Sequence, residues 1–267
     1  MVGKIWKLLL CLSLLGLLAP AARAASTKEV NRTVNLNPTG RISIDTFKGS
    51  VDVAVWDSPQ VEIKAKIESD GSCIEDEERV RDTEVRIDSS PDSLRIKSDY
   101  DRVRKSFGMM DLFRWNCGNL PSVHYRLKVP RTAQVRIKDH KSEIRVAGLR
   151  SDLQVTSYKG TMTLTDLNGS LDLETYKGEA RVEFANLAGR SRLETYKGNI
   201  QASMPRNSRF DLETDLGRRG NLDSDFNFNV KIGGLRERGQ KYHGSVNGGG
   251  PLLYVKTYKG EFRLRQR

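Results

Sequence analysis

The sequence predicts an all-β chain that folds as a parallel β-solenoid with about 18–20 residues in each coil. The tetrapeptide Thr-Tyr-Lys-Gly occurs at 175–178, 195–198 and 257–260, and internal repetition of this kind is typical of stacked architectures. Around these copies apolar and polar residues alternate with a period of two, which indicates strands. Equivalent positions also carry the same residue type, as parallel stacking requires.

Near copies of the tetrapeptide extend the repeat in both directions. They lie at 46–49 (Thr-Phe-Lys-Gly), 139–142 (Asp-His-Lys-Ser), 157–160 (Ser-Tyr-Lys-Gly) and 214–217 (Thr-Asp-Leu-Gly). From 142 to 217 the fourth positions step by 18, 18, 20 and 19 residues, and the last step, to 260, is 43 residues. We interpret that last step as one repeat carrying about 24 additional residues (43 − 19).

Each repeat consists of two short strands and two tight turns, such as the turn at Asn168-Gly169. A meander would pair successive strands as antiparallel hairpins, whereas a solenoid pairs equivalent strands in parallel. Like residues would then stack about 4.8 Å apart. The predicted columns are Leu173/Leu193/Leu212, Thr175/Thr195/Thr214 and Gly178/Gly198/Gly217. We favour a flattened solenoid over the hexapeptide β-helix, since each repeat carries two turn signals and not three.

Residues 25–130 are predicted to form a β-rich capping module that continues the core of the repeats at 131–267. Pro130 marks the boundary. A short helix is expected at 72–81, where Ser72 could cap a first turn rich in acidic residues. The expected strands are 30–36, 42–45, 51–55, 61–67, 85–87, 94–96 and 123–129. Such a module would cover the open end of the solenoid, where unpaired backbone groups invite aggregation.

Residues 1–24 have the pattern of a cleaved signal peptide. Lys4 and Lys7 precede the apolar run 8–18, and Ala22-Arg23-Ala24 supplies the small residues of a cleavage site after Ala24. The run is about half as long as a membrane-spanning helix requires. With 37% hydrophobic and 30% charged residues, the remaining chain is too polar for an integral membrane protein. We expect a secreted or periplasmic protein with no transmembrane segment after cleavage.

Cys73 and Cys117 remain after that cleavage, and an oxidising compartment would allow them to form a disulfide. They are 44 residues apart, so the chain-entropy model gives a bridge worth about 4 kcal/mol. A reactive thiol pair or a metal site is the alternative. Neither cysteine lies in a Cys-x-x-Cys motif and only His124 is near, so the structural bridge is favoured.

The repeat places lysines in one column and glutamates in another. The lysine column contains Lys141, Lys159, Lys177, Lys197 and, further on, Lys259, and the acidic column contains Glu174, Glu194 and Glu213. The two columns could simply neutralise each other on a solvated face. Alternatively, the lysines form a basic strip for anionic polymers such as lipopolysaccharide, teichoic acid or acidic glycans. Further cations for that strip would be Arg181, Arg190, Arg192, Arg209, Arg218 and Arg219.

Tyr158, Tyr176 and Tyr196 form a third column, preceded by His140 and interrupted at Asp215. Tyrosines on a rigid ladder could stack against sugar rings while the adjacent lysines hold carboxylates or phosphates. Alternatively, each tyrosine folds over its own turn and packs on the next. The candidate ligand-binding residues are therefore Tyr158, Tyr176, Tyr196, Lys159, Lys177 and Lys197.

A segment at 102–121 carries exposed apolar candidates beside Cys117. Met109, Met110, Phe113 and Trp115 lie among basic residues, so the segment could contact a membrane or a partner. It could equally pack on the capping module as a cap held by the disulfide.

The sequence contains little that would support an enzyme or a cofactor. His124, His140 and His243 lie in different elements without metal-ligand spacing, so no metal is expected. Motifs of zinc proteases, serine hydrolases and phosphate-binding loops are missing. The three glycines 248–250 lack the Lys-Ser/Thr of such a loop and are interpreted as a turn. Parallel β-helices do include polysaccharide lyases and hydrolases, but a repeated glutamate column is more typical of architecture than of catalysis.

The order of several short motifs resembles the bacterial putative adhesin family, also catalogued as a domain of unknown function. The matching segments are 40–44 running into 46–49, 51–57, 61–65, 125–130, the Tyr-Lys-Gly repeats, 224–226 and 248–264. The resemblance implies an extracytoplasmic β-solenoid without established catalytic residues. The segment at 102–121 and the two cysteines depart from that pattern.

These observations predict a non-enzymatic binding or scaffold protein of the cell envelope. It would present a face of tyrosine, lysine and arginine to anionic glycans or protein partners; no nucleic acid is expected. The first alternative is a structural or envelope-stress accessory protein whose partner binds the segment 102–121. The second alternative is a polysaccharide-active enzyme.

Overall fold

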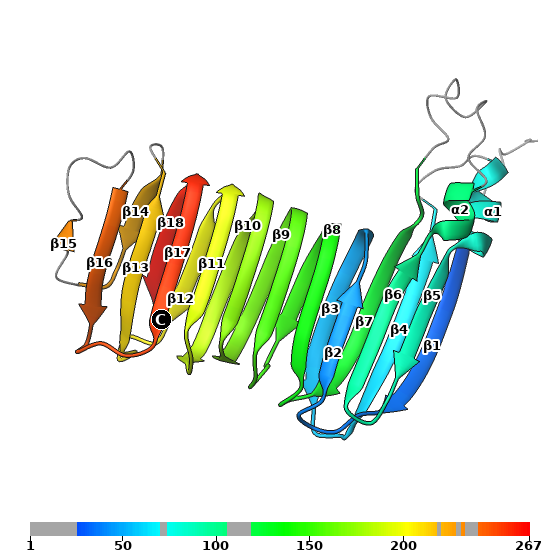
Figure 1. Cartoon of the computed structure of the whole chain (residues 1–267), viewed down its shortest axis with the longest axis horizontal. Coiled ribbons are helices and arrows are strands. Elements are labelled where there is room, and N and C mark those ends of the chain that lie inside the picture. Colours follow the sequence, from blue (N-terminus) through cyan, green and yellow to red (C-terminus); the bar gives the residue numbers. More distant parts are fainter. Residues whose placement is uncertain (1–25, 70–73, 106–118, 218–219, 228–230, 233–239) are drawn as a thin grey trace, which may run out of the picture.

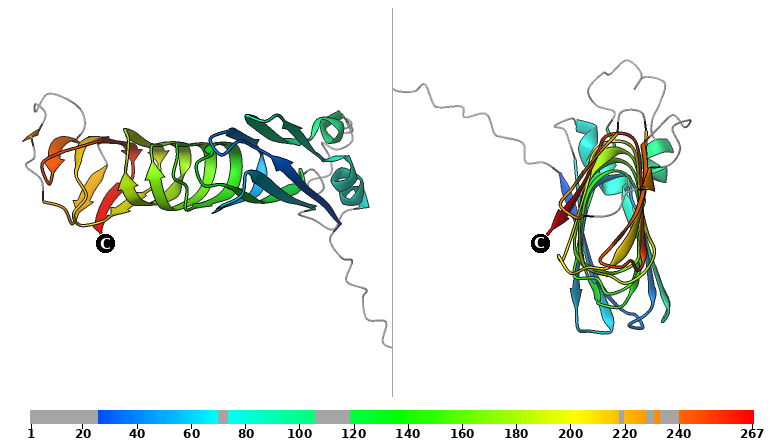
Figure 2. Two further views of the ribbon diagram at one scale, coloured as in Figure 1. Left: turned by 90° about the horizontal axis from the view of Figure 1, so that it is seen from below. Right: turned by 90° about the vertical axis from the view of Figure 1, so that its left-hand side faces the viewer.

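The protein is an elongated body built almost entirely of strands that run across its long axis (Figure 1). The structure is a computed structural model that describes residues 26–69, 74–105, 119–217, 220–227, 231–232 and 240–267. Viewed along the axis, the coils superimpose as a flattened ring with two broad faces (Figure 2). The prediction of an all-β, solenoid-like chain is confirmed.

One face of the ring is formed by strands that follow one another along the axis by hydrogen bonding. In spatial order they are β5 (Glu84–Ser89), β6 (Ser93–Asp99), β2 (Arg41–Asp45), the first halves of β8 (Gln134–Ala147), β9 (Leu153–Gly169) and β10 (Leu171–Leu187), then β11 (Ser191–Lys197), β17 (Leu252–Lys259), β13 (Phe210–Leu216), β16 (Gln240–Val246) and β15 (Lys231–Ile232). Pairing is parallel from β6 to β13 and antiparallel at both ends.

The second face is formed in the same way by the strands that follow each corner. In order they are β1 (Thr27–Asn35), β4 (Gln60–Glu68), β7 (Ser122–Pro130), β3 (Lys48–Trp56), the second halves of β8, β9 and β10, then β12 (Ile200–Met204), β18 (Glu261–Gln266) and β14 (Asn221–Ser224). Helices α1 (Ile74–Asp82) and α2 (Asp101–Lys105) lie at the end that contains β1 and β5 (Figure 1). The helix predicted at 72–81 corresponds to α1, whereas α2 was not predicted.

The repeat register agrees with the predicted columns as far as β11. Leu173 pairs with Leu193 and with Val155, and Thr175 pairs with Thr195. Their side chains point into a continuous apolar core between the two faces, because every second residue around these positions of β9, β10 and β11 is buried. The near copy at 46–49 also joins the stack, since Lys48 pairs with Lys141.

Beyond β11 the predicted order of coils is wrong. The copy at 257–260 stacks directly on β11, with Thr257 against Thr195 and Lys259 against Lys197. Strand β13 then pairs with β17, displaced by two residues, so that Thr214 lies beside Val255 and Leu216 beside Thr257. Leu212, Thr214 and Gly217 therefore do not continue the leucine, threonine and glycine columns.

Burial of Leu216 accounts for this displacement. In the predicted register Leu216 would take the exposed corner position that lysine occupies in the other coils. In the observed register it is fully buried, and removing a leucine side chain from water stabilises a protein by about 1.5–3 kcal/mol. The C-terminal strands β17 and β18 fit beside β11 and β12 because they carry the complete Thr-Tyr-Lys-Gly corner.

One corner contains a buried carboxylate, Asp139, at the position that threonine or serine occupies in the other coils. Asp139 accepts hydrogen bonds from the backbone N–H of Ser142 at 2.9 Å, from its hydroxyl at 2.5 Å, and from the Ser157 hydroxyl at 2.8 Å. Burial nevertheless raises the pKa of Asp139 above its ordinary value, because desolvation of the charge outweighs these hydrogen bonds. The charge is thus tolerated at this corner at a cost in stability.

Replacing Asp139 should therefore change how stability depends on pH. A raised pKa in the folded state means that the carboxyl contributes most to stability below its unfolded pKa, and that this contribution is lost as the pH rises through the folded pKa. We expect Asp139→Asn to raise Tm at pH 7 relative to the parent chain and to leave Tm unchanged at pH 3. Asp139→Leu, which leaves the three donors unpaired, should cost about 1–3 kcal/mol at both pH values. Thermal unfolding followed by circular dichroism measures both, and a gain for Asp139→Asn that persists at pH 3 would contradict the assignment.

Candidate functional site

Six aromatic rings form one stacked row along the corner that joins the two faces. The row runs Phe47, His140, Tyr158, Tyr176, Tyr196 and Tyr258. Neighbouring ring centroids are 4.6–5.1 Å apart, and neighbouring planes differ by only 3–8°. The spacing follows from parallel pairing, because adjacent strands place equivalent residues about 4.8 Å apart. The predicted tyrosine column is therefore longer than expected, and Tyr258, not Asp215, follows Tyr196.

For the three inner tyrosines, the stacking leaves only the ring edges and hydroxyls open to solvent. Tyr158, Tyr176 and Tyr196 are each stacked on both faces by a neighbouring ring, while 41–44% of their surface remains exposed. Stacking of a sugar ring on these three tyrosines would require the row to open. A ligand of the closed row would instead contact its hydroxyls and edges.

A lysine ladder follows the aromatic row one residue further along each corner. It consists of Lys48, Lys141, Lys159, Lys177, Lys197 and Lys259, which pair with one another from strand to strand. Burial and the charge of Lys141 lower the pKa of Lys48. Among the described residues, none of the other five lysines forms an ion pair with an acidic side chain. The ladder is thus a line of like charges that an anionic ligand would neutralise.

On its other side the aromatic row borders a shallow groove of about 470 Å³. Glu174 and Glu194 line this groove together with Lys138 and Lys256. Lys256 lies 2.8 Å from Glu194, which raises the pKa of the lysine. The predicted acidic column ends here, because Glu213 pairs with Tyr254 and Lys256 takes the next position beside Glu194. This side of the row is close to electrically neutral, so the excess positive charge lies on the lysine side.

None of the described arginines that were predicted to join the lysines belongs to the ladder. Arg192 forms an ion pair with Glu194 on the first face. Arg181 lines a separate depression on the second face, beside Arg263. Arg218 and Arg219 lie outside the described residues. The cationic strip therefore rests on lysines.

The apolar residues of the predicted partner segment and both cysteines of the predicted disulfide also lie outside the described residues, whereas 102–105 belong to α2. This applies to Met109, Met110, Phe113 and Trp115, and to both Cys73 and Cys117. Both remain predictions.

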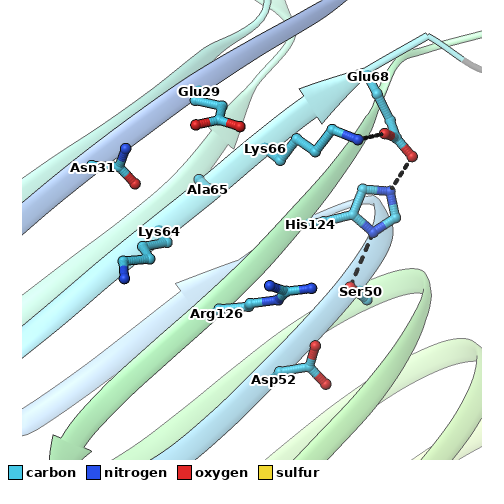
Figure 3. A pocket seen from close by; sticks show the side chains of 10 residues that line it. All are labelled: Glu29, Asn31, Ser50, Asp52, Lys64, Ala65, Lys66, Glu68, His124 and Arg126. Atoms are coloured by element: carbon cyan, nitrogen blue, oxygen red, sulfur yellow. Dashed lines mark hydrogen bonds and ion pairs between the residues drawn. The ribbon is translucent and has the colours of Figure 1, made fainter. Parts of the chain in front are cut away.

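A second pocket, of about 370 Å³, lies on the outer face of β1, β4, β7 and β3, and Ser50 at its edge is two residues after Lys48 of the ladder (Figure 3). A chain of polar contacts forms one wall. His124 Nδ1 lies 3.0 Å from the Ser50 hydroxyl, and its Nε2 lies 3.2 Å from the Glu68 carboxylate, which Lys66 also contacts. The Glu68 carboxylate has a lowered pKa, chiefly because Lys66 hydrogen-bonds to it. Sequence reasoning missed this cluster, because its members come from three separate strands.

The order serine, histidine, carboxylate also occurs in serine hydrolases, but this cluster lacks their second requirement. Acyl transfer needs preorganised donors, often backbone N–H groups, aimed at the developing oxyanion. Here Ser50, His124 and Lys66 are cross-strand neighbours on a regular sheet, in which backbone N–H groups lie in the plane and bond to the adjacent strands. The cluster therefore fits the wall of a binding pocket better than a nucleophile.

Among the described residues, no group of three or more His, Cys, Asp or Glu side chains could hold a metal ion. No helix in the part of the chain described by the structure is long and apolar enough to cross a membrane.

A match to a family model supports the resemblance found from the motifs. Residues 118–240 match the family model described as Toastrack DUF4097. No curated protein matches the sequence. Among solved structures, the chain is similar to a putative cell adhesion protein from Clostridium sporogenes, with a TM-score of 0.49, 12% identity and coverage of 91% of this chain and 100% of that one. It is also similar to a putative adhesin from Bacteroides fragilis, with a TM-score of 0.41, 11% identity and coverage of 89% and 97%.

Proposed function

We propose, starting from the Toastrack DUF4097 domain that residues 118–240 match, that this chain is a non-enzymatic binding or scaffold protein of the cell envelope. It is secreted or periplasmic after cleavage of residues 1–24. Its binding surface is the lysine ladder together with the exposed edges of the aromatic row. The ligands are linear anionic glycans, or protein partners that offer a comparable line of negative charge.

The uninterrupted lysine ladder is the observation that carries this proposal. Like charges on a protein surface are usually widely spaced or paired with opposite charges, because two like charges 4 Å apart in water repel by about 1 kcal/mol. Here the strand register holds successive lysines on adjacent strands. A flexible anion that runs along the ladder would relieve this repulsion at each lysine and release counterions, as polyanion binding generally does. The tyrosine hydroxyls beside the lysines add hydrogen-bond donors at the same spacing.

Substitution of the ladder lysines tests the proposal. We expect Lys159→Gln/Lys177→Gln/Lys197→Gln to weaken binding to immobilised heparin at least tenfold and to make the remaining binding less salt-dependent, because three charge contacts are lost. Tyr176→Phe should have a smaller effect, since it removes one hydroxyl and preserves the stacking. Binding is measured by surface plasmon resonance between 50 and 200 mM salt.

The matched control removes three lysines from another part of the surface. Lys64→Gln/Lys66→Gln/Lys128→Gln changes the net charge equally but lies on the second face. If both triple variants lose binding equally, the attraction is a property of net charge and the ladder is not the site. If neither does, the alternative in which a partner binds the segment 102–121 becomes the better explanation. Release of reducing ends from a polysaccharide would instead support the enzyme alternative.

A further inference from the structure

The pocket on β1, β4, β7 and β3 is lined by charged side chains, most of which are already paired (Figure 3). Lys66 contacts Glu68, and Lys64 lies 3.1 Å from Glu62. The Asp52 carboxylate accepts a hydrogen bond from Arg145 at 3.1 Å. These contacts neutralise both lysines and two of the acids at the pocket without any ligand.

Two opposite charges are left over after this pairing. Arg126 of β7 and Glu29 of β1 are exposed side chains that line the pocket, and neither forms an ion pair or side-chain hydrogen bond within the described part of the chain. Arg126 is a cross-strand neighbour of Asp52 and of Lys64, but Asp52 is engaged by Arg145. Glu29 is a cross-strand neighbour of Lys66, which is engaged by Glu68. Among the residues that the structure describes, the pocket therefore has one unpaired guanidinium and one unpaired carboxylate.

The strand order sets the separation of these two charges. β4 lies between β1 and β7, and Glu29 pairs with Lys66 whereas Arg126 pairs with Lys64, so the Cα atoms of Glu29 and Arg126 are two strand spacings and two residues apart, about 12 Å. Asn31, His124 and Ser50 supply further hydrogen-bonding groups around the two charges. An extended peptide spans at most about 3.3–3.6 Å per residue, so two or three residues would fit between the charges. The pocket volume also falls within the usual range for small-ligand sites.

We propose that this pocket binds a short zwitterionic peptide of two or three residues with free ends. Arg126 holds the terminal carboxylate in bidentate fashion, as guanidinium groups do. Glu29 accepts hydrogen bonds from the terminal ammonium group. Asn31 and the Ser50–His124 pair bond to the peptide amides between them, and the Glu68–His124–Ser50 chain fixes the orientation of the imidazole. This site is independent of the lysine ladder, which lies at the corner of the solenoid.

The test uses trialanine and its two capped forms with the full chain. Binding is followed by chemical-shift titration, with N-acetyl-trialanine and trialanine amide as the capped ligands. We expect each cap to weaken binding at least tenfold for the parent chain. In Glu29→Gln the acetyl cap should cause no further loss, and in Arg126→Gln the amide cap should cause no further loss, because the charge that each cap removes has already lost its partner.

Arg95→Gln and Asp88→Asn are the matched controls. They change the same kinds of exposed side chain on the other face, on β6 and β5, and both should bind all three ligands as the parent chain does. The proposal is overturned if trialanine gives no saturable shifts near Ser50 and His124, or if a capped ligand binds as tightly as the free peptide. It is also overturned if the effect of each cap is the same in every variant. If only the amide cap weakens binding, the pocket recognises the terminal carboxylate of the peptide alone, and Glu29 is not part of the site.

Discussion

Gly198→Ala should destabilise the protein by about 3 kcal/mol or more. Gly198 has φ +148°, a conformation that side chains with a Cβ rarely adopt, and strain of this kind costs about 1–3 kcal/mol. A Cβ at this position would also lie 1.7 Å from the carbonyl oxygen of Gly178 in the neighbouring coil. That atom belongs to the backbone of the stack, so relief of the clash requires two coils to separate. Because a domain is stable by only about 5–15 kcal/mol, the loss would be a large part of the total.

The repeat supplies a matched control for this substitution. Gly189 lies at a turn between β10 and β11, where an added Cβ would meet only the Ser170 side chain at an ordinary 3.4 Å. We expect Gly189→Ala to change stability by less than about 0.5 kcal/mol, as surface substitutions usually do. Urea unfolding of both variants, followed by circular dichroism, makes the comparison. Equal stability of the two would show that the corner glycines tolerate a side chain and that the coils are not in van der Waals contact there.

The corner glycines also show how much of the fold the sequence could predict. Spacing and residue type were enough to predict the parallel columns from Lys141 to Lys197, because a glycine, a lysine and an aromatic residue recur at one corner. They were not enough to order the last coils. The chain order suggested that 214–217 follows 195–198, whereas the copy at 257–260 fits that place better in side-chain chemistry. Strand order is decided by tertiary packing, which a linear repeat count does not contain.

The candidate sites show the same limit at the level of side chains. The tyrosine column could be predicted, but whether its rings face solvent or one another depends on rotamers, and the structure stacks them face to face. The pocket beside His124 had no sequence signal. Ser50, His124 and Lys66 alternate with buried residues on their own strands, and only the cross-strand register brings them into one row.

Deletion of residues 251–267 should release the whole C-terminal part of the solenoid. β17 is bonded on one side to β11 and on the other to β13, and β18 lies in the same way between β12 and β14. Without them, β13 and β14 lose their parallel partners, and β16, which pairs in antiparallel fashion with β13, is left without a supported neighbour. The deletion also removes the fully buried side chains Leu253, Val255, Phe262 and Leu264. At about 1.5–3 kcal/mol each, their burial contributes about 6–12 kcal/mol, which is comparable with the stability of a whole domain.

Limited proteolysis distinguishes this result from the one that stacking in chain order would give. If 210–216 followed β11 directly, the deleted chain would keep residues 206–250 folded and protected. In the observed order, deletion of β17 and β18 leaves residues 206–250 without a coil to pack on. Cleavage should then begin after Met204 and leave the same fragment as a control chain that lacks 206–267. Because β11 and β12 would then present an uncovered edge, both shortened chains should also self-associate more than the full chain. A protected fragment extending to residue 250 would contradict this order, because it would show that the preceding strands fold without β17 and β18. The lysine ladder would then not continue from Lys197 to Lys259.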